Sequence, residues 1–120
     1  MEKKRFIVQL GTGIDLHGED VTAAACRAVR DAISSNCLCG LVEILELKKL
    51  DQIEVEILIA CPRPEAVDLE QVKKELPIGQ KSAQAVAGGM QTQGLCVPQF
   101  GPDCDQIIVA NAAVTVYISQ

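Results

Sequence analysis

The feature that most constrains the fold of this sequence is a helical pattern of small apolar residues directly after a strand pattern. Residues 5–11 alternate apolar and mixed side chains, which predicts a strand. From residue 21 to about residue 35, apolar side chains recur at the spacing of one helix face, and Asp20 is placed to cap this helix. The helix face consists of Val21, Ala24, Ala25, Ala28, Val29, Ala32 and Ile33. Because most of these side chains are small, we expect the helix to lie close against a sheet.

Four further segments complete the predicted secondary structure. Residues 53–61 alternate as a strand, and residues 69–76 form a short, charged helix. Residues 80–91 are predicted to be a strand as well. The last predicted strand, residues 106–118, is apolar on both faces. A strand that is buried on both sides in so small a domain implies helices on one face and another subunit on the other.

The connections between these elements are less regular. Residues 41–52 fit either a short helical turn or an irregular strand. Gly88-Gly89, near the end of the third strand, indicates a bulge or a close backbone approach. Residues 92–105 contain two glycines and two prolines, which is typical of a loop.

The predicted order of elements, β-α-β-α-β-β, indicates a single α+β domain over residues 1–120. We expect a two-layer sandwich with both helices on one face of the sheet. This order resembles the fold of Bacillus-type chorismate mutase. Relatives of that architecture include Rid-type imine deaminases, the repeats of barbiturase and cyanuric acid hydrolase, and the tubulin C-terminal domain. Several of them build three-fold assemblies with ligand sites between subunits, so the resemblance implies a homo-oligomer, a trimer or a multiple of it.

A glycine-containing segment, residues 11–18, joins the first strand to the first helix and is the candidate site. It reads Gly-Thr-Gly-Ile-Asp-Leu-His-Gly, which is neither a dinucleotide-binding fingerprint nor a Walker A loop. Asp15 and His17 are two residues apart, a spacing that suits an acid–base pair or a shared metal ion. The alternative is an ordinary turn that Asp15 caps. If the segment is a site, the backbone would bind an anion at the positions Gly11, Thr12, Gly13 and Gly18.

Two other sets of residues are candidates for chemistry. Lys81 and Ser82, at the start of the third strand, are candidate substrate contacts, although a lysine at a strand end is also typical of a solvated surface. Of the six cysteines, Cys26 and Cys61 fall in apolar patterns and are predicted to be small core residues. Cys96 and Cys104 flank the loop before the last strand and are the expected reactive pair, with their redox role left open.

Composition excludes several classes of partner. The formal net charge is −5, no basic stripe is present, and the chain has one Tyr, two Phe and no Trp, so we expect no nucleic-acid binding. No apolar stretch is long enough to cross a bilayer, and the charged N-terminus lacks the apolar region of a signal peptide. We therefore expect a cytoplasmic protein without a membrane partner, with its cysteines reduced.

The sequence also resembles a family of conserved hypothetical proteins found in bacteria and, with a long N-terminal extension, in plants. Its signature, G-x-G-x-D followed by H-G, appears here at residues 11–18, and the stretches 20–22 and 27–33 are similar too. The family has no assigned activity. The resemblance implies that Asp15 and His17 matter beyond a turn.

Three hypotheses about function follow. The first is an enzyme that binds, and transforms by acid–base chemistry, a small polar metabolite, with Asp15 and His17 as catalytic residues. The second is a module that binds a metal or a ligand without turnover, with Cys39, Cys96 or Asp105 as a third metal ligand. The third is a structural homo-oligomer. Whether the protein is an enzyme stays open, and so do its substrate, any cofactor and any metal.

Overall fold

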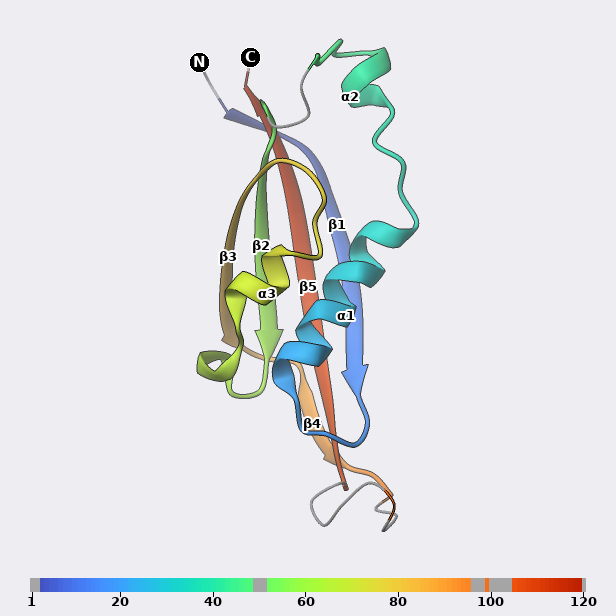
Figure 1. Cartoon of the computed structure of the whole chain (residues 1–120), viewed down its shortest axis with the longest axis vertical. Helices are drawn as coiled ribbons and strands as arrows, with labels where there is room; N and C mark the ends of the chain where they lie inside the picture. The colour runs from blue at the N-terminus through green and yellow to red at the C-terminus, as the bar shows by residue number, and fades with distance from the viewer. Residues whose placement is uncertain (1–2, 49–51, 96–98, 100–104, 120) are drawn as a thin grey trace.

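The protein is one mixed five-stranded sheet with its helices on one face, as Figure 1 shows. The computed structural model describes residues 3–48, 52–95, 99 and 105–119. Its elements, in chain order, are β1 (Lys3–Asp15), α1 (Val21–Ser34), α2 (Gly40–Glu43), β2 (Glu54–Cys61), the 3-10 turn η2 (Pro64–Ala66), α3 (Leu69–Lys73), β3 (Gln80–Ala87), β4 (Met90–Gln93) and β5 (Gln106–Ser119). The predicted α+β class is confirmed, with α1 and α3 covering the same face of the sheet.

The long strand β5 organises the sheet, whose order is β1-β5-β2-β3. It pairs antiparallel with β1 on one side and with β2 on the other, while β2 and β3 are parallel. Every second side chain of β5 is buried under the helices, including Ile108, Val114 and Val116. The central strand therefore supplies much of the core, in agreement with its apolar sequence.

The strand β1 is longer than its sequence pattern predicts, and this corrects the expectation of a loop after residue 11. Pairing with β5 continues through Gly13 and ends at Asp15, which lies opposite Ile108. The reason is that residues without side chains at positions 11 and 13 let α1 lie directly on the strand. A Cβ on Gly13 would stand 2.1 Å from the backbone oxygen of Ala24, so only glycine fits here.

The helix α1 begins and ends close to its predicted bounds. Asp20 caps it, since its carboxylate accepts a hydrogen bond from the N–H of Ala23 at 3.0 Å. Its alanines at positions 24, 25 and 28 are fully buried against the sheet. The helix α3 is shorter than predicted and ends at Lys73, but Leu76 beyond it is still buried. None of the helices in the described residues is long and apolar enough to cross a membrane.

The predicted strand over residues 80–91 is broken in two at Gly88-Gly89. Gly89 has a φ of +63°, and a Cβ there would stand 2.1 Å from the backbone oxygen of Val109. The chain passes the end of β2 at this point and continues as β4, which pairs with β5 from Met90 opposite Val109. The expected close backbone approach is thus confirmed. At this point the chain leaves β2, with which β3 pairs, and joins β5, with which β4 pairs. Residues 41–52 include the short helix α2, and residues 49–51 lie outside the described part of the chain.

The face of the sheet opposite the helices, called the open face below, is bare of other elements within the described residues. Its alternate residues on β1 lie beside Val109, Asn111, Ala113 and Thr115 of β5. The large apolar side chains exposed on it are Val8, Leu10, Ile14, Leu58, Val86 and Met90. The molecule is also elongated, 54 × 23 × 18 Å, with a radius of gyration of 16.3 Å, against about 14 Å expected for a domain of this length.

Candidate functional site

The carboxylate of Asp15 lies at the end of β1 and organises the turn into α1. The residue is 9% exposed. One of its oxygens, Oδ2, accepts hydrogen bonds from the N–H of Gly18 at 3.1 Å and of Asp20 at 2.9 Å. The other, Oδ1, lies 3.3 Å from Nη1 of Arg27. The same guanidinium nitrogen donates to the backbone oxygen of Ile14 at 2.6 Å, so α1, the turn and the strand end are tied together.

This geometry gives Asp15 a structural role, which is to hold the turn between β1 and α1. The sequence left this role open as the alternative to a catalytic one. Three donors already occupy the carboxylate, two of them backbone N–H groups of the turn it closes. His17 is half-buried in the same turn. Catalysis by Asp15 and His17 stays a prediction, because the geometry of the turn alone does not show a substrate.

The residues predicted as metal ligands do not gather into a metal-binding group. In the described part of the chain, no three His, Cys, Asp or Glu side chains lie close enough to hold one ion. Cys39 and Asp105 are therefore not brought together with Asp15 and His17, and Cys96 lies outside the described residues.

The predicted ligand-binding positions at 11–13 are part of a strand that other elements cover. Gly11 and Gly13 face α1, where a Cβ on Gly11 would stand 2.3 Å from the backbone oxygen of Ala28. The N–H of Thr12 donates to the carboxylate of Asp31 at 2.9 Å. These glycines thus serve close packing of helix on strand, in place of the expected loop. Gly18 does lie in the turn, with its N–H on Asp15.

The structure places Lys81 and Ser82 on opposite faces of β3. Lys81 turns toward the helices, where its ammonium donates to the backbone oxygen of Leu76 just beyond α3. This hydrogen bond uses one of the three donors of the ammonium, and a substrate contact at Lys81 stays a prediction. Ser82 lies on the open face, beside Glu56 of β2.

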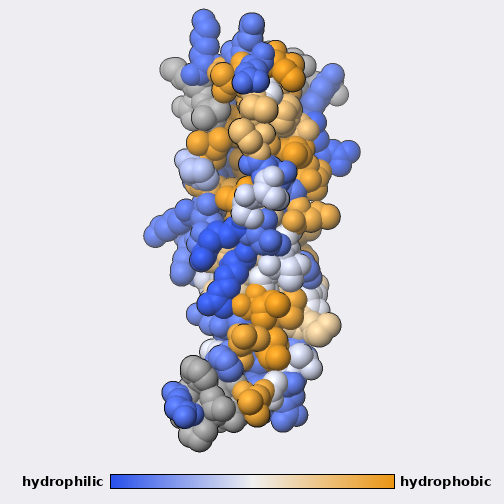
Figure 2. All heavy atoms as spheres, turned by 90° about the vertical axis from the view of Figure 1, so that its right-hand side faces the viewer, coloured by the Kyte–Doolittle hydropathy of each residue, from blue (hydrophilic) through white to orange (hydrophobic). Residues whose placement is uncertain are grey.

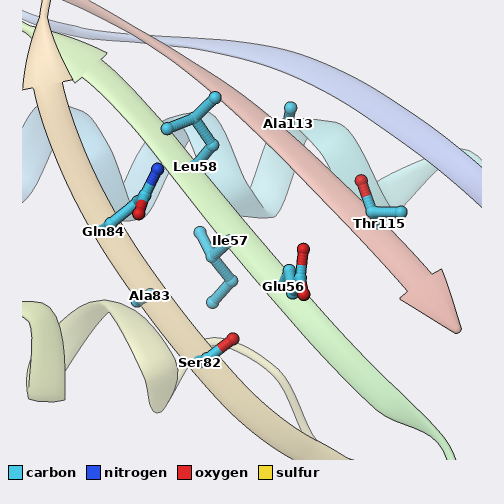
Figure 3. A pocket seen from close by; sticks show the side chains of 8 residues that line it. All are labelled: Glu56, Ile57, Leu58, Ser82, Ala83, Gln84, Ala113 and Thr115. Atoms are coloured by element: carbon cyan, nitrogen blue, oxygen red, sulfur yellow. The ribbon is translucent and has the colours of Figure 1, made fainter.

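A hollow of about 340 Å³ lies on the open face around Ser82 (Figure 3). Its polar side chains come from three adjacent strands: Glu56 from β2, Ser82 and Gln84 from β3, and Thr115 from β5. Leu58 and Ala113 add apolar surface. Of these residues, the sequence pattern indicated only Ser82, because one sequence does not show that β2, β3 and β5 are neighbours.

The carboxylate of Glu56 at the edge of this hollow is held in its charged form. Lys3 donates to its Oε1 and Tyr117 to its Oε2, both at 3.1 Å. The hydrogen bonds from Lys3 and Tyr117 lower the pKa of Glu56. The Lys3 ammonium also pairs with Glu54 at 3.2 Å and lies 4.2 Å from the centre of the Tyr117 ring. The hollow therefore has an ion-paired carboxylate at its edge, beside neutral polar groups.

Two of the cysteines are core residues, as predicted. Cys26 and Cys61 are at most 2% exposed, and burial raises the pKa of both thiols. Cys37 and Cys39 are exposed free thiols. The expected reactive pair, Cys96 and Cys104, lies outside the described residues.

Comparison with known proteins gives the chain a family. It is similar to the crystal structure of an FtsZ-like protein of unknown function from Nostoc punctiforme PCC 73102, with a TM-score of 0.90 and 42% sequence identity over 100% of this chain and 99% of that chain. No curated protein matches it. The family model of Lin0512_fam, a conserved hypothetical protein family, matches residues 5–116, which confirms the resemblance inferred from the sequence. The chain belongs to the Lin0512 family of conserved hypothetical proteins.

Proposed function

We propose that this protein is a homo-oligomer that covers its open face with further copies of itself and binds a small polar ligand in the hollow on that face. The observation that carries the proposal is the open face itself. Six large apolar side chains on it are between 39% and 75% exposed, and they come from four different strands. Large exposed apolar side chains that gather on one face are typical of a protein contact surface.

A second copy of the chain is the occupant that fits best. The middle of the open face combines apolar side chains with small or neutral ones such as Ala113, Thr115 and Asn111. Its charged cluster of Lys3, Glu54 and Glu56 lies at one end. A largely neutral face can meet its own copy without bringing like charges together. Figure 2 looks onto the edge of the molecule that bears β1 and α1, beside the open face, and shows hydrophobic surface in two areas separated by a band of hydrophilic side chains.

The arrangement of the sheet supports the same proposal. The strand order β1-β5-β2-β3, with both helices on one face, supports an architecture like that of Bacillus-type chorismate mutase. Several relatives of that architecture build three-fold assemblies, so we propose a trimer or a multiple of it. The similar Nostoc protein is described as FtsZ-like, and we propose that this chain shares that likeness in its fold. A likeness of fold does not by itself carry an activity.

The hollow would then lie between subunits, closed by the neighbouring copy. Its carboxylate and its neutral Ser82, Gln84 and Thr115 groups suit a small molecule with several N–H or O–H donors. This chemistry supports binding of a polar metabolite more directly than acid–base turnover, because Glu56 is the single titratable side chain among the described residues that line the hollow. Localisation in the cytoplasm is part of the proposal.

A pair of variants tests the assembly. Leu10 on the open face is 75% exposed, and Ile44 beside α2 is 78% exposed. Leu10→Glu places a charge in the proposed interface, so we expect it to shift the sedimentation velocity profile to a smaller species. Ile44→Glu also replaces an exposed aliphatic side chain by a carboxylate, at similar exposure, and should keep the wild-type profile. Equal profiles for both variants, or a monomeric wild type, would contradict the proposal.

The ligand part has its own test, with ethanolamine as the probe. We expect saturable binding of ethanolamine in ligand-observed NMR, and at least fivefold weaker binding to Glu56→Gln, which removes the charge at the hollow. Glu54→Gln is the matched control, since Glu54 lies on the same strand outside the hollow. Equal loss in both variants would point to nonspecific attraction by surface carboxylates and would refute this site.

A further inference from the structure

The opposite face of the sheet holds a second cavity, between β1, β2 and β5 and the chain segments that follow α1 and α3. Its volume is about 240 Å³. Most of its lining is apolar, with Ile33, Val55, Leu76 and Val114 among the side chains. None of the described residues that line it carries a charge. For comparison, a dry apolar cavity of about 150 Å³ is large enough to bind benzene.

The cavity exists because α1 ends before the strands do. Beside Gly11, the backbone of α1 at Ala28 and Ala32 lies directly on β1. Two residues before Gly11, at Gln9, β1 lies beyond the cover of α1. The helix ends there at Ser34, and the chain turns away toward α2. The sheet therefore continues past its helical cover, and the space above Gln9 and its partner Val114 is left open.

The amide of Gln9 is the unusual group in this cavity. Gln9 and Asp15 are the two buried polar residues in the described part of the chain, at 5% and 9% exposed. The carboxylate of Asp15 has three donors. The side-chain amide of Gln9 lines the cavity, and no hydrogen bond joins it to another described residue. Its N and O atoms are not among the fully enclosed atoms without a partner, so they reach the space of the cavity, where a ligand can pair with them.

A second amide lies at the cavity wall. Asn36 donates through Nδ2 to the backbone oxygen of Ala32 at 3.2 Å, which fixes it against the end of α1. Among the described residues that line the cavity, Asn36 and Gln9 are the two with polar side chains. An apolar pocket with a few placed polar groups is the usual form of a small-molecule site.

We propose that this cavity binds a small, neutral, mostly apolar molecule that carries one amide group. The ligand's apolar body would fill the space among Ile33, Val55 and Val114, and its amide would pair with Gln9 by donating one hydrogen bond and accepting another. A charged ligand is disfavoured, because nothing in the cavity compensates the loss of its hydration. This site lies on the helix side of the sheet, and it does not depend on the open face or its hollow.

Benzamide and benzoate are the probes, because they share a ring and differ in charge. We expect ligand-observed NMR to show saturable binding of benzamide and at least tenfold weaker binding of benzoate. Gln9→Leu should weaken benzamide at least fivefold, and Gln91→Leu, at an exposed glutamine of β4, should leave it unchanged. Ile33→Trp should also block benzamide binding, because the larger side chain fills the cavity. This second variant tests the proposal even if Gln9→Leu folds poorly.

Three results would overturn the proposal. These are no saturable benzamide binding to the wild type, equal binding of benzamide and benzoate, and full benzamide affinity in Gln9→Leu or Ile33→Trp. A side chain from a second copy seated in the cavity would give the first of these results. Leu10→Glu, which is designed to break the assembly, should keep benzamide binding. The cavity and the proposed assembly can therefore be confirmed or refuted independently.

Discussion

At the scale of single residues, Asp15 shows how one carboxylate can serve the fold at a position that resembles a catalytic site. Its two oxygens accept from the turn at Gly18 and Asp20 and from the guanidinium of Arg27. The spacing of Asp15 and His17 singled out this turn from the sequence. It did not show the three donors, because their convergence depends on the path of the backbone in space.

We predict that Asp15→Asn destabilises the protein by about 1–3 kcal/mol, because an amide offers one acceptor oxygen where three donors converge. Asp31→Asn is the control. Asp31 accepts from the N–H of Thr12, but it is exposed, so we expect a loss below about 1 kcal/mol. Urea unfolding of both variants measures the difference. An Asp15→Asn protein as stable as the wild type would show that the carboxylate is not a structural group and would favour the catalytic hypothesis.

The residues of the two cavities were harder to find from the sequence. Alternation along residues 53–61 separates Glu56 from the buried isoleucines, but it gives no partner strand. Gln9 stands among apolar residues of β1, and its burial depends on where α1 ends. Both facts come from tertiary structure, which local periodicity does not contain.

At the scale of elements, the close contact of α1 with β1 is the feature that the glycines make possible. We predict that Gly13→Ala destabilises the protein by roughly 1–3 kcal/mol, since the new Cβ meets backbone atoms of α1 and the helix must move outward. Gly18→Ala is the comparison, because a Cβ there would stand 3.1 Å from a side-chain oxygen of Asp15, and we expect it to cost less. Thermal unfolding gives both values. A neutral Gly13→Ala would mean that α1 does not pack on this strand as described.

Most of the helices and strands were predictable because their apolar periods are clear. The small-residue face of α1 and the two-sided apolar pattern of β5 gave the layers of the fold. The end of β1 was not predictable, because Gly11 and Gly13 suggest a loop when the helix that covers them is unknown. The division into β3 and β4 also depends on a contact distant in sequence, between Gly89 and Val109.

At the scale of the whole molecule, the open face is the feature on which the proposed self-association rests. Fully burying a Val, Leu, Ile or Met side chain contributes roughly 1.5–3 kcal/mol, so the six on this face could contribute on the order of 5–10 kcal/mol when partly covered. Association of two proteins costs roughly 4–15 kcal/mol in lost freedom. The two ranges overlap, so self-association stays a prediction that the molar mass in solution tests. The sequence indicated this through β5, whose second apolar face has no cover within the described residues.

The molar mass of the wild-type protein in solution tests the central claim most directly. Size-exclusion chromatography with light scattering, over a tenfold dilution, should give about 38 kDa, three times the 12.8 kDa of one chain, or a multiple of that mass. A stable mass near 12.8 kDa at every concentration would contradict the account. The open face would then be exposed in the free protein, and its apolar side chains would need another partner.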